Sequence, residues 1–150
     1  MLCPSVIQKI EIMPLVLARC PAFTPTWEKH RLSWEGEEAG IYNDLAEFAT
    51  FIVNCYAQED IEPVVAAFAL IEELLVGGNE EVRNAAAIGF LEDIQNIASW
   101  RPFKAVVFVQ WLGAKSILAW AEIEEMWRGK SSLADVVRAE QRAIKNEPKS

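Results

Sequence analysis

The segment Gly77-Gly78-Asn79 most strongly constrains how this chain folds, because it separates two amphipathic helical patterns. Before it, apolar residues recur at helical spacing through residues 61–76, at Ile61, Val64, Phe68, Ile71 and Leu75. After it, the same spacing runs through residues 80–98, at Val82, Ala86, Phe90, Ile94 and Ile97. Paired glycines suit a helix C-terminus with one residue left-handed, and Asn79 suits the next N-cap. The sequence predicts an antiparallel helix hairpin, similar to one unit of a helical repeat.

Two further segments carry equally regular apolar stripes. Residues 41–57 place apolar side chains at Tyr42, Leu45, Phe48, Ile52 and Tyr56. Residues 114–128 do so at Ile117, Trp120, Ile123 and Trp127. Both segments are therefore predicted to be helices with one buried face.

Helix boundaries follow from proline and capping residues. Thr24-Pro25 predicts a helix start with Thr24 as the cap, and the glycine-rich, acidic segment 34–40 predicts an exposed loop. Pro14 either kinks a helix over residues 5–20 or opens a second, shorter helix at its first turn. Asp60 is placed to cap the helix over 61–76.

The C-terminal third leaves one choice of secondary structure open. Residues 103–112 are rich in valine, so a strand competes with a short buried helix, which we favour because helices flank it. Ser132 predicts a last helix that reaches about Lys145, followed by a frayed tail, 146–150. No second copy of the hairpin recurs at a repeat spacing. The expected fold is all-α, with residues 1–150 forming one compact bundle of about six to seven helices.

Charge is concentrated in the middle of the chain. Residues 32–100 hold fourteen acidic residues and one basic residue, a net charge of −13, whereas the whole chain carries −8. Such a field repels nucleic acid and anionic membranes, and it attracts a basic protein surface. No apolar run approaches the roughly 18 residues of a membrane span, so we expect a cytoplasmic protein without a membrane or nucleic-acid partner.

The sequence contains no recognisable catalytic motif. It has no phosphate-binding glycine motif and no GxSxG turn, and its cysteines, Cys3, Cys20 and Cys55, have no metal-ligand spacing. His30 is the single histidine, and no acid in the sequence is evidently placed to orient it as a base for Cys20 or Ser33. We therefore expect a protein that is not an enzyme and has no cofactor or metal.

Certain acids and tryptophans are better candidates for contacts with a partner. Glu80 and Glu81 stabilise a helix start, but Glu92 and Asp93 lie late in their helix, where the macrodipole disfavours acids. Adjacent residues diverge by about 100° on a helix, so this pair does not suit a shared metal or catalytic site. Exposed tryptophan is a frequent interface anchor. The predicted partner-binding residues are Trp34, Glu37, Glu38, Glu72, Glu73, Glu92, Asp93, Gln95, Asn96 and Trp100.

Three stretches resemble a known family of proteins. The specific one, at residues 71–96, is IEELLVGGNEEVRNAAAIGFLEDIQN, and two weaker ones are CPAFTPTWEKH at 20–30 and AWAEIEEMWRGKSSLADVVRAE at 119–140. They resemble small acidic helical bacterial proteins that are similar to immunity proteins of polymorphic toxin systems, which act in interbacterial competition. The resemblance implies an all-helical fold and the neutralisation of a cognate toxin domain, and it assigns no catalytic residue.

These observations lead to two hypotheses about function. The first is an immunity protein that binds a basic toxin domain through its acidic surface. The alternative is a helical adaptor or structural interaction module without a toxin partner. Both leave homo-oligomerisation open, and neither identifies the toxin.

Overall fold

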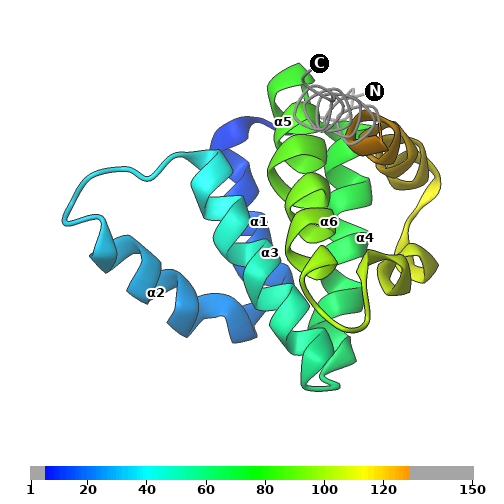
Figure 1. Cartoon of the computed structure of the whole chain (residues 1–150). Coiled ribbons are helices and arrows are strands. Elements are labelled where there is room, and N and C mark those ends of the chain that lie inside the picture. Colours follow the sequence, from blue (N-terminus) through cyan, green and yellow to red (C-terminus); the bar gives the residue numbers. More distant parts are fainter. Residues whose placement is uncertain (1–5, 129–150) are drawn as a thin grey trace, which may run out of the picture.

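The computed structural model describes residues 6–128, and every regular element in that range is a helix (Figure 1). A short 3₁₀ helix, Lys9–Glu11, leads into α1, Ile12–Arg19. A second one, Pro21–Phe23, leads into α2, Thr24–Ser33. Pro14 lies in the first turn of α1, where its missing N–H is no loss. Of the two alternatives, Pro14 therefore opens a shorter helix and does not kink a longer one.

The central helices are long and antiparallel (Figure 1). They are α3, Ile41–Ala57, and α4, Ile61–Gly77, followed after two residues by a continuous rod over 80–99. That rod begins as α5, Glu80–Asn84, and ends as α6, Glu92–Ser99. The turns between α5 and α6, Ala85–Leu91, are π-helical, a wider coil that is rare in proteins. The predicted all-α fold with a central helix hairpin is confirmed.

The last described elements pack against this hairpin. Ala105–Trp111 forms a 3₁₀ helix with Phe108 fully buried, so the segment is helical and the competing strand prediction is excluded. A helix over 114–128 follows. The predicted helix from Ser132 to Lys145 and the tail 146–150 lie outside the described residues.

Five phenylalanine rings form a continuous chain through the core. Each comes from a different element and is fully buried: Phe23, Phe48, Phe90, Phe68 and Phe108. Successive ring centroids along this series are 5.1, 5.4, 5.6 and 5.7 Å apart. These separations are typical of favourable aromatic pairs, which contribute about 0.5–1.5 kcal/mol each beyond their burial. The rings therefore join the start of α2, α3, the 80–99 helix, α4 and the last 3₁₀ helix into one core.

The turn of the hairpin differs from the prediction at one glycine. Asn79 caps the 80–99 helix as expected, because its Oδ1 accepts a hydrogen bond from the Val82 N–H at 2.9 Å. Neither Gly77 nor Gly78, however, has a positive φ, and Gly78 is extended, with φ −85° and ψ 158°. The prediction that one residue of this pair is left-handed is therefore wrong. A side chain at Gly78 would collide with Val82 and lie 2.5 Å from the carbonyl oxygen of Leu74. Glycine is needed here for close approach rather than for a positive φ.

The same turn is held by the N-terminal segment. The Ile7 N–H donates to the Gly77 carbonyl at 2.9 Å, and the Asn79 N–H donates to the Ile7 carbonyl at 3.2 Å. This isolated pairing satisfies backbone groups that the end of α4 would otherwise leave without partners. It replaces the glycine-based helix termination that the sequence suggested.

Two predicted helix starts differ in detail. The N-cap of α2 is Phe23 rather than Thr24, because the preceding 3₁₀ turn runs directly into the helix and Phe23 is anchored in the core. Asp60 is the N-cap of α4, but its side chain makes no capping hydrogen bond.

The buried face of the helix over 114–128 also differs. Trp120 and Ile123 are buried as predicted, but Ile117 is 47% exposed and Trp127 is 36% exposed. Ser116 takes the remaining inward position, at 0% exposure. A bond from Ser116 to α4, described below, sets which side of this helix turns inward.

We expect Gly78→Ala to destabilise the fold strongly, by about 2–4 kcal/mol, because the added methyl group has no space. Gly77→Ala is the matched control, because a Cβ there would meet only the side chain of Ile7 at 3.4 Å. Its effect should stay below about 1 kcal/mol. Urea unfolding of both variants measures the difference, and equal midpoints would contradict this account of the turn.

Candidate partner-binding site

The ten predicted partner-binding residues occupy four places in the structure. Trp34, Glu37 and Glu38 lie in the exposed loop that joins α2 to α3. Gln95, Asn96 and Trp100 lie at the end of α6. Glu92 with Asp93 and Glu72 with Glu73 form the other two groups, on α6 and on α4.

Glu72 has a structural role. It lies on α4, and its carboxylate accepts hydrogen bonds from the backbone N–H groups of Lys115 and Ser116, at 3.0 and 2.8 Å, and from the Ser116 hydroxyl at 2.8 Å. These amides belong to the first turn of the helix over 114–128, so Glu72 caps that helix from another element. Gly113 leaves room for it, because a Cβ there would lie 2.5 Å from the carboxyl group. The expectation that Glu72 extends a partner surface is therefore corrected.

Glu73 also has a partner within the chain. Both guanidinium nitrogens of Arg19 at the end of α1 bind its carboxylate, the longer of the two bonds being 3.0 Å. Arg19 lowers the pKa of Glu73 below its ordinary value by this hydrogen bond and its charge, against a smaller effect of burial. For Glu72, burial opposes the charged form most strongly, yet the Lys115 and Ser116 bonds together lower its pKa. Both acids bind elements of this chain, so neither stands ready for an external cation.

Glu92 and Asp93 are half-buried, and they lack such partners. Among the described residues, no hydrogen bond or ion pair compensates the charge of Asp93. Burial, and then the charge of Glu92, raise the pKa of Asp93 to about 6. Ionisation of the Asp93 carboxyl group therefore destabilises the protein when no partner is bound. Strongly shifted pKa values are more common at functional sites than at structural positions.

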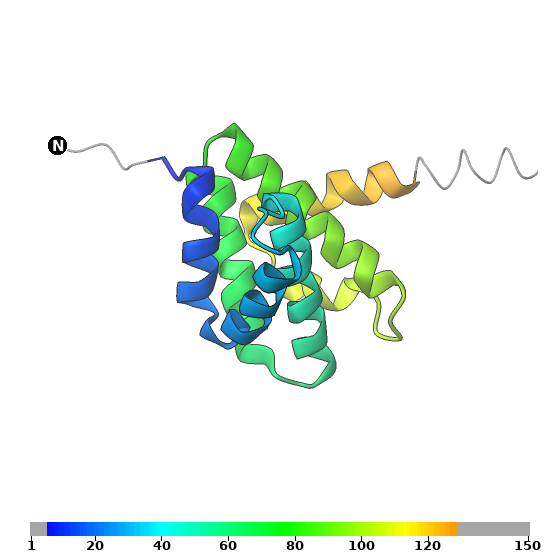
Figure 2. The same cartoon turned by 90° about the vertical axis from the view of Figure 1, so that its left-hand side faces the viewer.

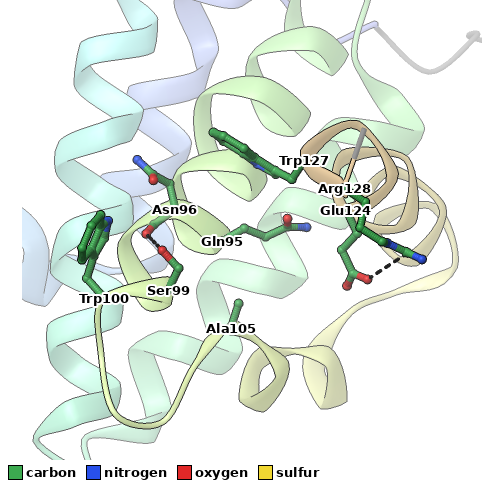
Figure 3. Close-up of a pocket in the computed structure, with 8 residues that line it drawn as sticks. All are labelled: Gln95, Asn96, Ser99, Trp100, Ala105, Glu124, Trp127 and Arg128. Carbon is green, nitrogen blue, oxygen red and sulfur yellow. Dashed lines mark hydrogen bonds and ion pairs between the residues drawn. The ribbon is translucent and has the colours of Figure 1, made fainter. Parts of the chain in front are cut away.

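The end of α6 lines one surface hollow, here called the α6 hollow, of about 470 Å³ (Figure 3). Its walls come from α6, the following loop and the helix over 114–128: Gln95, Asn96, Ser99, Trp100, Ala105, Glu124, Trp127 and Arg128. Trp100 is 84% exposed, in line with its predicted role as a surface residue.

Gln95 does not share that exposure. It is only 8% exposed, and its Nε2 donates to the backbone carbonyl of Trp120 at 3.1 Å. It therefore ties α6 to the helix over 114–128, and the expectation of a freely exposed amide beside Asn96 is corrected.

A second and larger hollow, here called the α2 hollow, has a volume of about 1080 Å³. It lies between α2, the loop 34–40 and the starts of α1 and α3. The predicted residues Trp34, Glu37 and Glu38 all line it. In Figure 2, α2 and the loop 34–40 face the viewer and lie in front of the body of the protein. The structure thus brings three predicted site residues together with side chains that the sequence did not connect to them.

One of those additional side chains is His30. Its Nε2 lies 2.9 Å from Asp44 Oδ1 on α3, its Nδ1 lies 3.9 Å from Glu47 Oε2, and the side chain is 8% exposed. The sequence did not reveal this acid, because Asp44 lies on a different helix, α3, and only the packing of α2 against α3 brings it to His30. With carboxylates at both ring nitrogens, His30 is suited to join α2 to α3.

Neither Cys20 nor Ser33, the two nucleophiles considered for His30 in the sequence, bonds to its ring. The Ser33 hydroxyl donates to the backbone carbonyl of His30, and the Cys20 thiol contacts the Pro63 carbonyl. Cys20 and Cys55 are buried as expected, and burial, with a smaller effect of Cys55, raises the pKa of Cys20 to about 11. Cys3 lies outside the described residues. Within residues 6–128, the geometry therefore provides no activated nucleophile beside His30.

Two searches of residues 6–128 were negative. No three His, Cys, Asp or Glu side chains in this range gather as a metal-binding group. None of the helices described combines the length and the apolar character needed to cross a bilayer.

The described residues define an all-α acidic protein that carries the α6 hollow and the α2 hollow on its surface. The family model described as "Domain of unknown function (DUF7674)" matches residues 13–128. The chain belongs to this family. No curated protein and no solved structure matches the chain.

We expect the adjacent residues Glu72 and Glu73 to differ sharply on substitution. Glu72→Ala leaves the first amides of the helix over 114–128 uncapped and should cost about 1–2 kcal/mol. Glu73→Ala removes an ion pair whose side chains are 42% and 48% exposed, and such surface pairs contribute at most about 1 kcal/mol. Thermal unfolding compares the two, and a larger loss for Glu73→Ala would contradict the capping role.

Asp93 should make stability depend on pH. Its pKa in the folded protein, about 6, exceeds the ordinary 3.8, so the stability that this group supports is complete below about pH 3.8 and is lost as the pH rises through about 6. Asp93→Asn removes this loss. The variant should exceed the wild type by about 1 kcal/mol at neutral pH after allowance for solvent screening. Urea midpoints measured across this range test it, and parallel pH curves for the two proteins would contradict it.

Proposed function

We propose that this protein is an immunity-type protein that binds a cognate bacterial toxin domain and neutralises it. Binding would cover the active site or the substrate surface of the toxin. No catalysis by this chain is required, which agrees with the absence of a catalytic motif from the sequence. The encounter would take place in the cytoplasm of the cell that the protein protects.

The observation that carries this proposal is the large share of uncompensated acids. Of the fourteen acidic residues in 32–100, five have partners among the described residues: Asp44, Glu47, Glu72, Glu73 and Glu81. Nine have no ion pair with any described residue: Glu35, Glu37, Glu38, Glu59, Asp60, Glu62, Glu80, Glu92 and Asp93. Among the described residues, the fold thus pairs a minority of these fourteen acids, and we infer that the other nine can attract a partner.

Uncompensated acids at this density favour a basic protein as the partner. They attract cationic surfaces, accelerate their association and discourage anionic partners. A basic toxin domain, for example a nuclease, fits this charge. The resemblance of residues 71–96 to small acidic helical proteins that are similar to immunity proteins supports the same proposal.

The proposal predicts a salt-sensitive complex with the toxin domain encoded beside this chain. Co-expression should protect cells from that toxin, and the two proteins should co-purify. Affinity should fall by about tenfold or more between about 0.05 and 0.5 M salt, because screening weakens the attraction of exposed charges. Titration calorimetry at several salt concentrations measures this.

Two results would count against the proposal. A neighbouring reading frame without any toxin domain would favour the helical adaptor instead. Binding that does not change with salt would show that the acidic surface does not drive association, even if a complex forms.

A further inference from the structure

We propose that the α2 hollow is the docking site for a segment of the partner that carries lysine or arginine together with apolar side chains. This inference rests on the function proposed above and identifies the surface and the chemistry of the contact.

The outer wall of the hollow is a helix held at a few points. No residue of α2 is buried, so α2 projects from the body of the protein (Figure 1). At its base, Phe23 packs on Phe48 and Phe51, with ring centroids 5.1 and 5.2 Å away. Further along, the bond between His30 and Asp44 ties α2 to α3. These contacts fix the wall in place while the hollow beside it stays open.

Apolar side chains line the hollow without being covered. Ile10 is 83% exposed, Leu32 is 76% exposed and Trp34 is 36% exposed. They come from three separate segments, before α1, in α2 and in the loop, and they surround one depression. Exposed apolar side chains gathered with polar residues around them are typical of protein interaction sites.

Charge defines what kind of segment fits. Glu35, Glu37 and Glu38 line the hollow and have no ion pair within the described range. The basic side chains there are already engaged, since Lys9 Nζ lies 3.1 Å from Glu81 and Arg31 lies 3.7 Å from Glu28. The hollow is therefore negatively charged, and it would repel a nucleic acid or an anionic lipid surface.

Aromatic rings provide a second reason for a cationic occupant. Trp27 and Trp34 both line the hollow, and both contact the His30 ring, with centroids 5.8 and 6.4 Å from it. Lysine and arginine bind favourably over tryptophan faces, and the apolar stems of these side chains can cover Leu32 and Ile10. Acids and tryptophans around an apolar surface thus match an amphipathic, basic segment.

The α6 hollow is less suited to this role. Its acid, Glu124, lies 3.9 Å from Arg128, so a cation within the hollow already faces it. Its volume is also less than half that of the α2 hollow. We therefore assign the basic segment to the α2 hollow.

Two matched pairs of variants test the assignment by titration calorimetry with the neighbouring toxin domain. Glu37→Lys/Glu38→Lys changes the hollow, and Glu59→Lys/Glu62→Lys makes the same change in net charge on exposed acids outside it. The first should weaken binding by about a hundredfold and the second by less than about tenfold, because long-range steering affects both but only the first loses contacts. Urea unfolding confirms that each variant remains folded.

Trp34→Ala and Trp100→Ala form the second pair. Both are tryptophans beside a hollow: Trp34 is 36% exposed at the α2 hollow, and Trp100 is 84% exposed at the α6 hollow. Each variant therefore removes the same side chain from a different hollow. We expect Trp34→Ala to weaken binding by about tenfold or more and Trp100→Ala to leave it nearly unchanged.

The outcomes separate this inference from the proposed function. If the wild-type chain does not bind the toxin domain, the proposed function is wrong, and the proposed docking of a basic segment of the toxin in the α2 hollow is wrong with it. If the wild type binds but both lysine pairs weaken binding equally, or Trp100→Ala alone does so, the function stands and the α2 hollow is not the docking site.

Discussion

The chain of five phenylalanine rings is the interaction on which the rest of the structure depends. Phe23, Phe48, Phe90, Phe68 and Phe108 connect five elements that are distant in the sequence, and each ring is fully buried. Burial of an aromatic side chain contributes roughly 1.5–3 kcal/mol, and the ring pairs add to this. The Phe23 ring stands at one end of this series of rings, directly before α2. The helix α2 therefore starts at a fixed point, although none of its own residues is buried.

With the core made from apolar side chains, the acids are free to serve other purposes. Glu72 and Glu73 are neighbours on α4, yet one caps a distant helix and the other binds Arg19 of α1. Asp93 remains half-buried with no compensating charge from any described residue, at a cost that rises with pH. Carboxylates that support the fold and carboxylates that remain available thus alternate along the same acidic segment, and local charge density alone does not distinguish them.

The α2 hollow connects the core to the proposed role in toxin binding. A helix attached through Phe23 and the bond of His30 to Asp44 leaves an acidic, aromatic depression between itself and the body. A surface of this kind is energetically unfavourable in an isolated protein, because it leaves apolar side chains in water and like charges close together. It becomes favourable when a basic segment covers both, and this is the physical argument for the proposed docking of such a segment.

The sequence by itself determined the helices, the hairpin and the exposed loop. Apolar spacing along 41–57 and the Asn79 cap are local properties, because they depend on residues three or four positions apart. The exposure of Trp34 and Trp100 also followed from their places next to glycine, arginine and proline.

Only the tertiary structure decided the contacts between distant segments. The backbone of Ile7 pairs with the turn at Gly78, Ser116 engages Glu72, and Asp44 engages His30. The same bond to Ser116 turned Ile117 outward, against the apolar pattern of its helix. Each of these outcomes depends on which side chain of another helix arrives within about 3 Å, and periodicity within one helix holds no information about that distance.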